Sequence, residues 1–239
     1  MAKKRRTKST KRPSTGTKSG AVRPSQALRK SVLMRKIEAS KAKKLDLYAM
    51  HKNEYLASGL PSFVRVGPAQ YLAFDGRGKP GAPDFATGIG AMYSVAFTVK
   101  MAFKAAGKDY AVTKLEALWW RDDDTSSPTK DTLWDWTLLI RVPPFVSAKE
   151  LLAAQDSLLA KGKPDTVKRV LLIELKEDTC VQILHVGPYM EEAGSIAKMQ
   201  AFAERAGRAF NGKQHEIYLS DPRRVKDDRL RTILRQPVA

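Results

Sequence analysis

Hydrophobic and polar positions past residue 45 follow two different periods, which predicts both strands and helices. Alternation over residues 63–74 predicts an extended segment, interrupted at Gly67-Pro68. Apolar residues then recur at helical spacing over residues 85–106, a predicted helix that Gly107 ends. Two further strands are predicted at residues 110–120 and 132–142, with a polar loop between them.

The order strand, helix, strand, strand is then predicted a second time. Ser147 and Glu150 form a capping box at the start of an intervening helix that runs to about residue 161. The later elements are strands at residues 170–175 and 179–186, a helix at 195–206, and strands at 216–219 and 231–234. Val66-Gly67-Pro68 is echoed by Val186-Gly187-Pro188. We therefore predict an α+β fold of two pseudo-symmetric strand–helix–strand–strand modules that share an antiparallel sheet and one core.

Charge divides the chain into two unequal parts. Residues 1–44 hold 16 of the 43 basic residues and one of the 25 acidic residues, a net charge of +15. The remaining 27 basic and 24 acidic residues leave +3 for residues 45–239. Residues 1–44 contain too few apolar side chains to offset the entropy lost on ordering, so we expect a disordered basic tail followed by one folded domain. Such a tail attracts nucleic acid non-specifically, and the alternative is a solubilising extension.

Cysteine content and hydropathy bear on the compartment. Cys180 is the only cysteine, so the chain has no intramolecular disulfide, and a reducing cytoplasm is the expected location. No apolar run is long enough to span a bilayer, and no apolar region of a signal peptide follows the basic N-terminus. A transit peptide is conceivable, because the tail is rich in Arg and Ser. We expect no membrane partner.

Several catalytic and cofactor motifs are absent or misleading. The segment from Gly76 to Gly81 has the spacing G-x-G-x-x-G, but Pro80 and Pro83 interrupt the helix that a dinucleotide site requires. We interpret it as a glycine-rich turn and expect no cofactor. The three histidines are scattered, and no metal site is expected.

Acidic and aromatic residues in the strands are the candidate site. Strand alternation places Glu116 and Trp120 on one face and Trp119 on the other, while Glu216 shares a face with Tyr218. A carboxylate in an apolar strand has to be hydrogen-bonded, paired, or exposed to a cavity. Indole rings make good walls for a flat ligand. In the alternative interpretation the tryptophans are plain core and the acids are paired with arginine or lysine.

Several motifs in one order resemble the GyrI-like domain family over residues 45–238. The C-terminal match is His215-Glu216-Ile217-Tyr218-Leu219-Ser220-Asp221-Pro222-Arg223-Arg224, followed by residues 231–238. The other matching segments are residues 184–189, 115–120 and 93–100. The resemblance implies a pseudo-two-fold α+β domain with a hydrophobic small-molecule pocket between its halves. Members serve as ligand-sensing parts of multidrug-responsive regulators, as gyrase modulators, and as stand-alone proteins that include hydrolases of cyclopropanoid DNA-alkylating compounds.

By motif match, the resemblance implies an acidic residue among aromatic walls. The candidate catalytic residues are Glu216, Glu116 and Tyr218. The candidate ligand-binding residues are Trp119, Trp120, Tyr93, Phe97, Trp136, His185 and Tyr189. The match does not fix which face of each strand meets the ligand.

Two hypotheses follow for the function. In the first, the protein is an enzyme that opens a cyclopropane ring by adding water, with Glu216, and Glu116 if it lies within reach, acting on the water and Tyr218 or a partner acid donating a proton. In the second, the domain sequesters or senses drug-like aromatic ligands without turnover, and the acid neutralises a cationic ligand. In either case the basic tail would hold the protein near nucleic acid.

Overall fold

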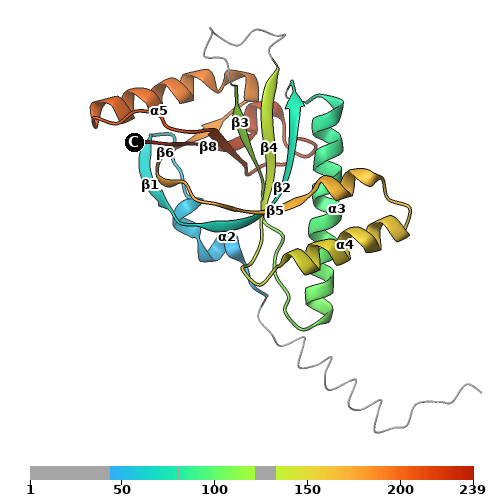
Figure 1. Cartoon of the computed structure of the whole chain (residues 1–239). Coiled ribbons are helices and arrows are strands. Elements are labelled where there is room, and N and C mark those ends of the chain that lie inside the picture. Colours follow the sequence, from blue (N-terminus) through green and yellow to red (C-terminus); the bar gives the residue numbers. More distant parts are fainter. Residues whose placement is uncertain (1–43, 80, 122–132) are drawn as a thin grey trace, which may run out of the picture. The chain divides into compact units, whose positions relative to one another are not determined.

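The computed structural model describes residues 44–79, 81–121 and 133–239, so the predicted tail lies almost entirely outside the described residues. Eight strands form one sheet in the order β1-β6-β8-β7-β3-β4-β2-β5, and every pairing is antiparallel (Figure 1). The strands are β1 (Ser62–Val66), β2 (Ala69–Gly78), β3 (Leu115–Trp120), β4 (Trp134–Arg141), β5 (Leu171–Leu175), β6 (Asp178–Val186), β7 (Gln214–Tyr218) and β8 (Arg231–Pro237). The α-helices of the described residues are α2 (Leu47–Met50), α3 (Pro83–Ala105), α4 (Ala148–Ala160) and α5 (Ala193–Arg205). The predicted α+β fold is confirmed.

The sheet has the predicted internal symmetry. The first module, β2-α3-β3-β4, contributes neighbouring strands in the order β3-β4-β2. The second, β6-α5-β7-β8, contributes β6-β8-β7. The modules meet where β7 pairs with β3, with Ala117 opposite Glu216, so the acid lies at the junction of the two halves.

The two outermost strands are exchanged between the modules. β1 precedes β2 in the chain but pairs with β6, whereas β5 precedes β6 but pairs with β2. Gly67 and Pro68 therefore do more than interrupt one strand, because they separate two strands that lie in different halves of the sheet. The exchange ties the halves together at both edges.

Helices cover one face of the sheet, which we call the front face. α3 packs against β2 and β4, and α4 packs against α3 (Figure 1). α5 packs against β6 in the other half, where Met199 and Ala203 join a core of Val181, Ile183 and Leu234. The central strands β7 and β3 lie between these two helical covers.

Residues 45–58, which we call the N-terminal strap, cover part of the opposite back face. Leu45 forms a bridge with Tyr110, and Tyr55 packs on Ile217 and Ile233. The Ser58 carbonyl then accepts a hydrogen bond from the Leu184 amide at 2.7 Å. The strap thus runs from the first module to the second.

Local signals at the helix ends match the structure. Ser147 and Glu150 form the predicted capping box of α4. The interpretation of Pro83 as a helix breaker is corrected, because Pro83 opens α3 at a first-turn position where the missing amide proton of proline is tolerated. Gly76 and Gly78 lie in β2, so only the end of the glycine-rich segment is a turn. None of the helices in the described segments combines the length and hydropathy needed to cross a bilayer.

Candidate functional site

Strand β7 presents three polar side chains to the front face. Gln214, Glu216 and Tyr218 alternate with His215 and Ile217, which face the back. Glu216 is 8% exposed. A carboxylate so deeply buried requires hydrogen bonds or a shared proton.

Hydrogen bonds hold the Glu216 carboxyl group on both oxygens. The Tyr218 hydroxyl donates to Oε2 at 2.8 Å, and the Gln214 amide donates to Oε1 at 3.1 Å. The Trp119 indole N–H donates to the Tyr218 oxygen at 3.2 Å. The hydrogen bonds thus run in one direction, from Trp119 to Tyr218 and from Tyr218 to the Glu216 carboxyl group.

Glu192 supplies a second buried acid beside Glu216. It immediately precedes α5, and its carboxyl group lies against that of Glu216, so the two can form a hydrogen bond when one of them is protonated. Burial and the charge of Glu216 raise the pKa of Glu192 to about 10. Burial also raises the pKa of Glu216, although hydrogen bonds from Tyr218, Glu192 and Gln214 oppose the rise. We call Glu192 and Glu216 the acid pair, since burial raises the pKa of both carboxyl groups and favours a proton shared between them.

Aromatic rings surround the acid pair. Tyr189 meets Tyr218 edge to face with ring centres 5.7 Å apart, and Phe85 stacks on Trp119 at 5.2 Å. Tyr93 on α3 lies near enough to Asp221 for that charge to raise its pKa, although burial is the larger cause. These rings come from both modules, so the site has aromatic neighbours on both sides.

His185 anchors the segment that carries Glu192. Its Nδ1 is 3.1 Å from the Ser195 hydroxyl in α5, and its Nε2 is 3.1 Å from the Pro188 carbonyl oxygen. Gly187 between them has φ +139°, which a side-chain-bearing residue rarely adopts. The predicted ligand contact His185 thus lies at the site but has both ring nitrogens engaged.

Glu116 does not join this acid pair. Its register partners are Ile217 and Leu139, so it lies on the back face, whereas Glu216 lies on the front. The expectation that Glu116 and Glu216 act on one water is therefore corrected by the strand register. The acid beside Glu216 is Glu192 instead.

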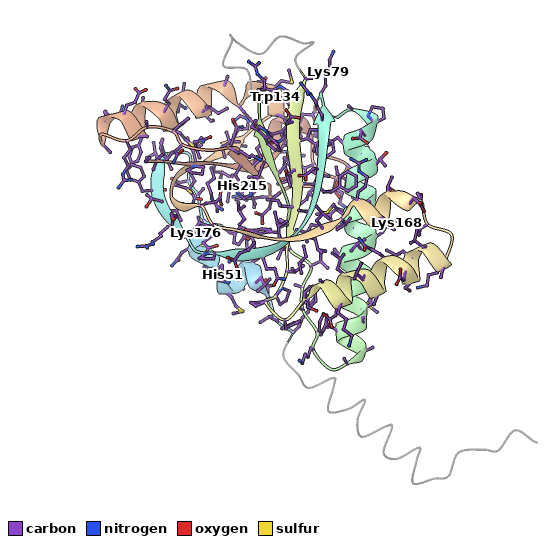
Figure 2. All side chains as sticks on the ribbon, viewed as in Figure 1. His51, Lys79, Trp134, Lys168, Lys176 and His215 are labelled. Atoms are coloured by element: carbon purple, nitrogen blue, oxygen red, sulfur yellow. The ribbon has the colours of Figure 1, made fainter. Side chains whose placement is uncertain are left out.

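Glu116 belongs to a buried ionic network on the back face. His215, which Figure 2 labels among the strands, has Nε2 2.9 Å from Glu116 Oε2 and Nδ1 3.0 Å from Glu177 Oε1. Arg235 contacts Glu177 at 3.2 Å, and the Tyr55 hydroxyl donates to Glu116 at 3.1 Å. Glu116 is thus a paired acid, as in the alternative interpretation, but its partners are His215 and Tyr55 rather than the expected arginine or lysine.

Charge balance explains how this network tolerates burial. Burial alone would lower the pKa of His215, but the charge of Glu177 and hydrogen bonds to Glu116 and Glu177 raise it to about 9. Burial alone would raise the pKa of Glu177, but His215 and Arg235 lower it to about 2. Glu54 from the strap forms an ion pair with Arg141 and accepts a hydrogen bond from Arg235 through its carbonyl oxygen. Three carboxylates thus meet three cations.

The other aromatic candidates lie in different environments. Trp136 is fully buried and packs over Gly76, next to Phe74 and Phe85, so it is core rather than a ligand wall. Trp120 lies on the back face with the Lys213 ammonium 3.2 Å from its ring centre. Phe97 is 51% exposed on α3, where it stacks with Tyr93. The expected contacts of Trp136 and Trp120 with a ligand at Glu216 are therefore corrected.

A cavity of about 410 Å³ also lies on the back face. Its walls include Leu118, Glu177 and Lys213. Since Leu118 pairs with His215 in the register, the sheet separates this cavity from the acid pair. It is not part of the site at Glu216.

Together, the fold and the acid pair between two helical covers define a pseudo-symmetric small-molecule-binding domain. The match to a family model is direct: residues 61–239 match the GyrI-like small molecule binding domain, and the chain belongs to that family. The family resemblance of the sequence is thereby confirmed.

Solved structures support the assignment. The chain is similar to a conserved protein from Listeria innocua at 34% identity and a TM-score of 0.76, covering 82% of this chain and 100% of that one. It is similar to a hydrolase from Listeria innocua at 33% identity and a TM-score of 0.72, with the same coverages of 82% and 100%. The EcmrR C-terminal domain shares the fold at 14% identity and a TM-score of 0.50, over 75% of this chain and 96% of that one. No curated protein matches the chain.

Proposed function

We propose that this protein binds flat, hydrophobic aromatic molecules over Glu216 and hydrolyses cyclopropanoid compounds that alkylate DNA. The observation that carries the proposal is the acid pair: two buried carboxyl groups lie side by side, and Glu216 accepts hydrogen bonds from Tyr218 and Gln214. Two buried acids in different protonation states provide a base and an acid in one place. The resemblance to a Listeria innocua hydrolase at 33% identity supports a hydrolytic activity.

The reaction we propose is the addition of water to a cyclopropane conjugated with a dienone. The ionised Glu216 takes a proton from water as the water oxygen bonds to a ring carbon. The ring C–C bond breaks, and its electron pair moves through the conjugated system to the carbonyl oxygen. Protonated Glu192 returns a proton to that oxygen, which becomes a phenol, so the net change is the gain of one water molecule.

Aromatic neighbours would hold the substrate during this step. Tyr189, Tyr218 and Trp119 offer ring faces and edges on one side of the acid pair, and Tyr93 with Phe97 extends the aromatic surface along α3. Stacking of this kind contributes about 1 kcal/mol per ring pair beyond the buried area. It also keeps bulk water away from the electrophilic carbon.

The test is a turnover measurement with a cyclopropanoid alkylator. The hydrate is followed by mass for the wild type, for Glu216→Gln, and for Glu174→Gln, an exposed acid on β5 that serves as the control. We expect many turnovers per protein for the wild type and the control, and at least a hundredfold loss in Glu216→Gln. Protection of one alkylator per protein with no hydrate would instead support the alternative of a binding module that sequesters ligands.

We also propose that residues 1–44, with a net charge of +15, attach the protein to nucleic acid without sequence preference. Counterion release makes such binding steeply dependent on salt. DNA affinity of the whole chain should fall as salt rises, and a chain beginning at residue 45 should bind far more weakly. Equal affinity of the two chains would contradict this role.

A further inference from the structure

Thr232 is a buried hydroxyl at the acid pair that the proposed reaction does not use. It lies in β8 opposite Tyr218 of β7 and opposite His185 of β6. Side chains of directly opposed residues share a face, so Thr232 faces the front, as Glu216 does. It is 1% exposed.

No described residue provides a hydrogen-bond partner for the Thr232 hydroxyl. The polar atoms of its neighbours are hydrogen-bonded elsewhere. Both ring nitrogens of His185 have partners, and the Tyr218 hydroxyl is bonded to Trp119 and Glu216. A buried hydroxyl without a partner destabilises the folded state, whereas valine would fill the same space without this penalty. The position therefore indicates a partner outside the chain.

The segment above Thr232 is fixed by three contacts. Tyr189 rests on Tyr218, Glu192 is bonded to Glu216, and Ser195 is bonded to His185. Thr232 lies between the strand residues that receive these contacts. Glu192 Oε1 is likewise a buried atom with no hydrogen-bond partner among the described residues. Thr232, on the strand beside Tyr218 and His185, and Glu192, at the start of the helix bonded to His185, thus each carry a buried polar atom without a partner among the described residues.

We propose that the Thr232 hydroxyl and the acid pair together bind the water molecule that attacks the substrate. This inference rests on the proposed hydrolysis and makes Thr232 a positioning residue. Thr232 Oγ1 accepts one O–H of the water and the ionised carboxylate accepts the other, which leaves an oxygen lone pair for the ring carbon. As the C–O bond forms, the carboxylate takes its proton and the bond to Thr232 keeps the oxygen in line.

Three variants test the role. Thr232→Val removes the hydroxyl and keeps the shape, Thr232→Ser keeps the hydroxyl, and Thr137→Val is the control on the back face, where the Thr137 hydroxyl donates to Asp75 at 2.6 Å. With a cyclopropanoid alkylator, we expect kcat to fall about tenfold in Thr232→Val, the effect of one lost hydrogen bond, with KM changed less than about twofold. Thr232→Ser and the control should retain the wild-type kcat. An unchanged kcat in Thr232→Val would overturn the proposal.

Two further measurements separate this inference from the proposed function. A high-resolution crystal structure of the whole protein should contain an ordered water about 2.7–3.0 Å from Thr232 Oγ1 that is lost in Thr232→Val. An empty site, together with a melting temperature raised by a few degrees in Thr232→Val, would mean that the hydroxyl is merely unpaired and would overturn the inference. A wild type that shows the water but no turnover would refute hydrolysis while leaving the water site in place.

Discussion

His215 and Glu216 are adjacent in β7, yet they lie on opposite faces of the sheet in opposite electrostatic settings. His215 is a cation between Glu116 and Glu177, and Glu216 shares a proton with Glu192. On the back face, ion pairs balance the charges of the network. On the front face, a proton reduces the negative charge of the acid pair. One strand therefore connects the ionic network on the back face to the placement of Glu216 on the front face.

Replacing His215 should weaken the whole domain. His215→Gln removes the cation between two buried carboxylates, and breaking a buried ion pair in this way costs about 3–5 kcal/mol. Urea unfolding followed by tryptophan fluorescence measures the change. His51→Gln is the matched control, because His51 is partly exposed and pairs with Glu54 at 3.4 Å, and it should cost less than about 1 kcal/mol. Equal stability of the two variants would refute the structural role of the network.

Stability should fall on the alkaline side. The folded-state pKa of His215 is raised from 6.5 to about 9, and that of Glu192 from 4.5 to about 10, so the folded state holds protons that the unfolded chain has released. Their contributions are complete below the unfolded values and are lost as pH rises toward 9 and 10. Glu177, lowered to about 2, acts oppositely, and its contribution is lost as pH falls from 4.5 toward 2.

Thermal unfolding across pH checks these signs. The melting temperature should be highest near pH 4.5, where the loss at Glu177 ends and the loss at Glu192 begins, and lower at pH 9, and Glu192→Gln should flatten the decline above pH 4.5. A melting temperature that rises from pH 6 to pH 9 would contradict the raised pKa values.

The N-terminal strap should be necessary for stability although it precedes the matched residues 61–239. Glu54 and Tyr55 supply a carboxylate, a carbonyl oxygen and a hydroxyl to the network. A chain that begins at residue 61 leaves Arg141 and Arg235 under-paired and should lose about 3 kcal/mol or more relative to a chain that begins at residue 44. Denaturant titration of the two chains decides the matter, and equal midpoints would refute it.

Strand alternation predicts faces within a strand but not between strands. It separated Trp119 from Glu116 and grouped Glu216 with Tyr218, as the structure does. Whether Glu116 and Glu216 share a face depends on the register of β3 against β7, strands almost a hundred residues apart in the chain. The same limit conceals the exchange of β1 and β5 between the modules.

Glu192 could not be predicted as part of the site for a related reason. It lies at a helix start beside Glu191, where acidic residues are common because they interact favourably with the helix dipole. Only the packing of α5 over β6 and β8 brings it to Glu216. The sequence offers one indication that Glu192 lies near the site: it follows Gly187-Pro188-Tyr189 closely, and that segment resembles the family.

Two glycines should respond oppositely to alanine. A Cβ on Gly76 would lie 2.2 Å from the Trp136 ring, which is fully buried and has no room to move, whereas a Cβ on Gly90 in α3 meets nothing within 4 Å. Gly76→Ala should cost about 3 kcal/mol through overpacking, and Gly90→Ala should stabilise by about 0.5–1 kcal/mol through helix propensity. Thermal and urea unfolding measure both, and a tolerated Gly76→Ala would contradict the packing of Trp136 over this glycine.

Glu192→Gln should change the pH dependence of hydrolysis as well as its rate. In the wild type, the proposed reaction requires ionised Glu216 and protonated Glu192. The value of kcat/KM should therefore increase with pH as Glu216 ionises, at a pH above the usual pKa of a glutamate, and decrease near pH 10 as Glu192 ionises. The glutamine cannot donate a proton to the carbonyl oxygen that becomes the phenol, so kcat should fall about a hundredfold or more. Its amide can still donate to Glu216, so the acidic limb should stay in place, while the alkaline limb due to Glu192 disappears. Glu191→Gln, at an exposed neighbouring position, is the matched control and should keep the wild-type profile.

If Glu192→Gln retained both the rate and the alkaline limb, the proton donor would have to be another group. Tyr218 would be the next candidate, because its hydroxyl contacts Glu216 directly.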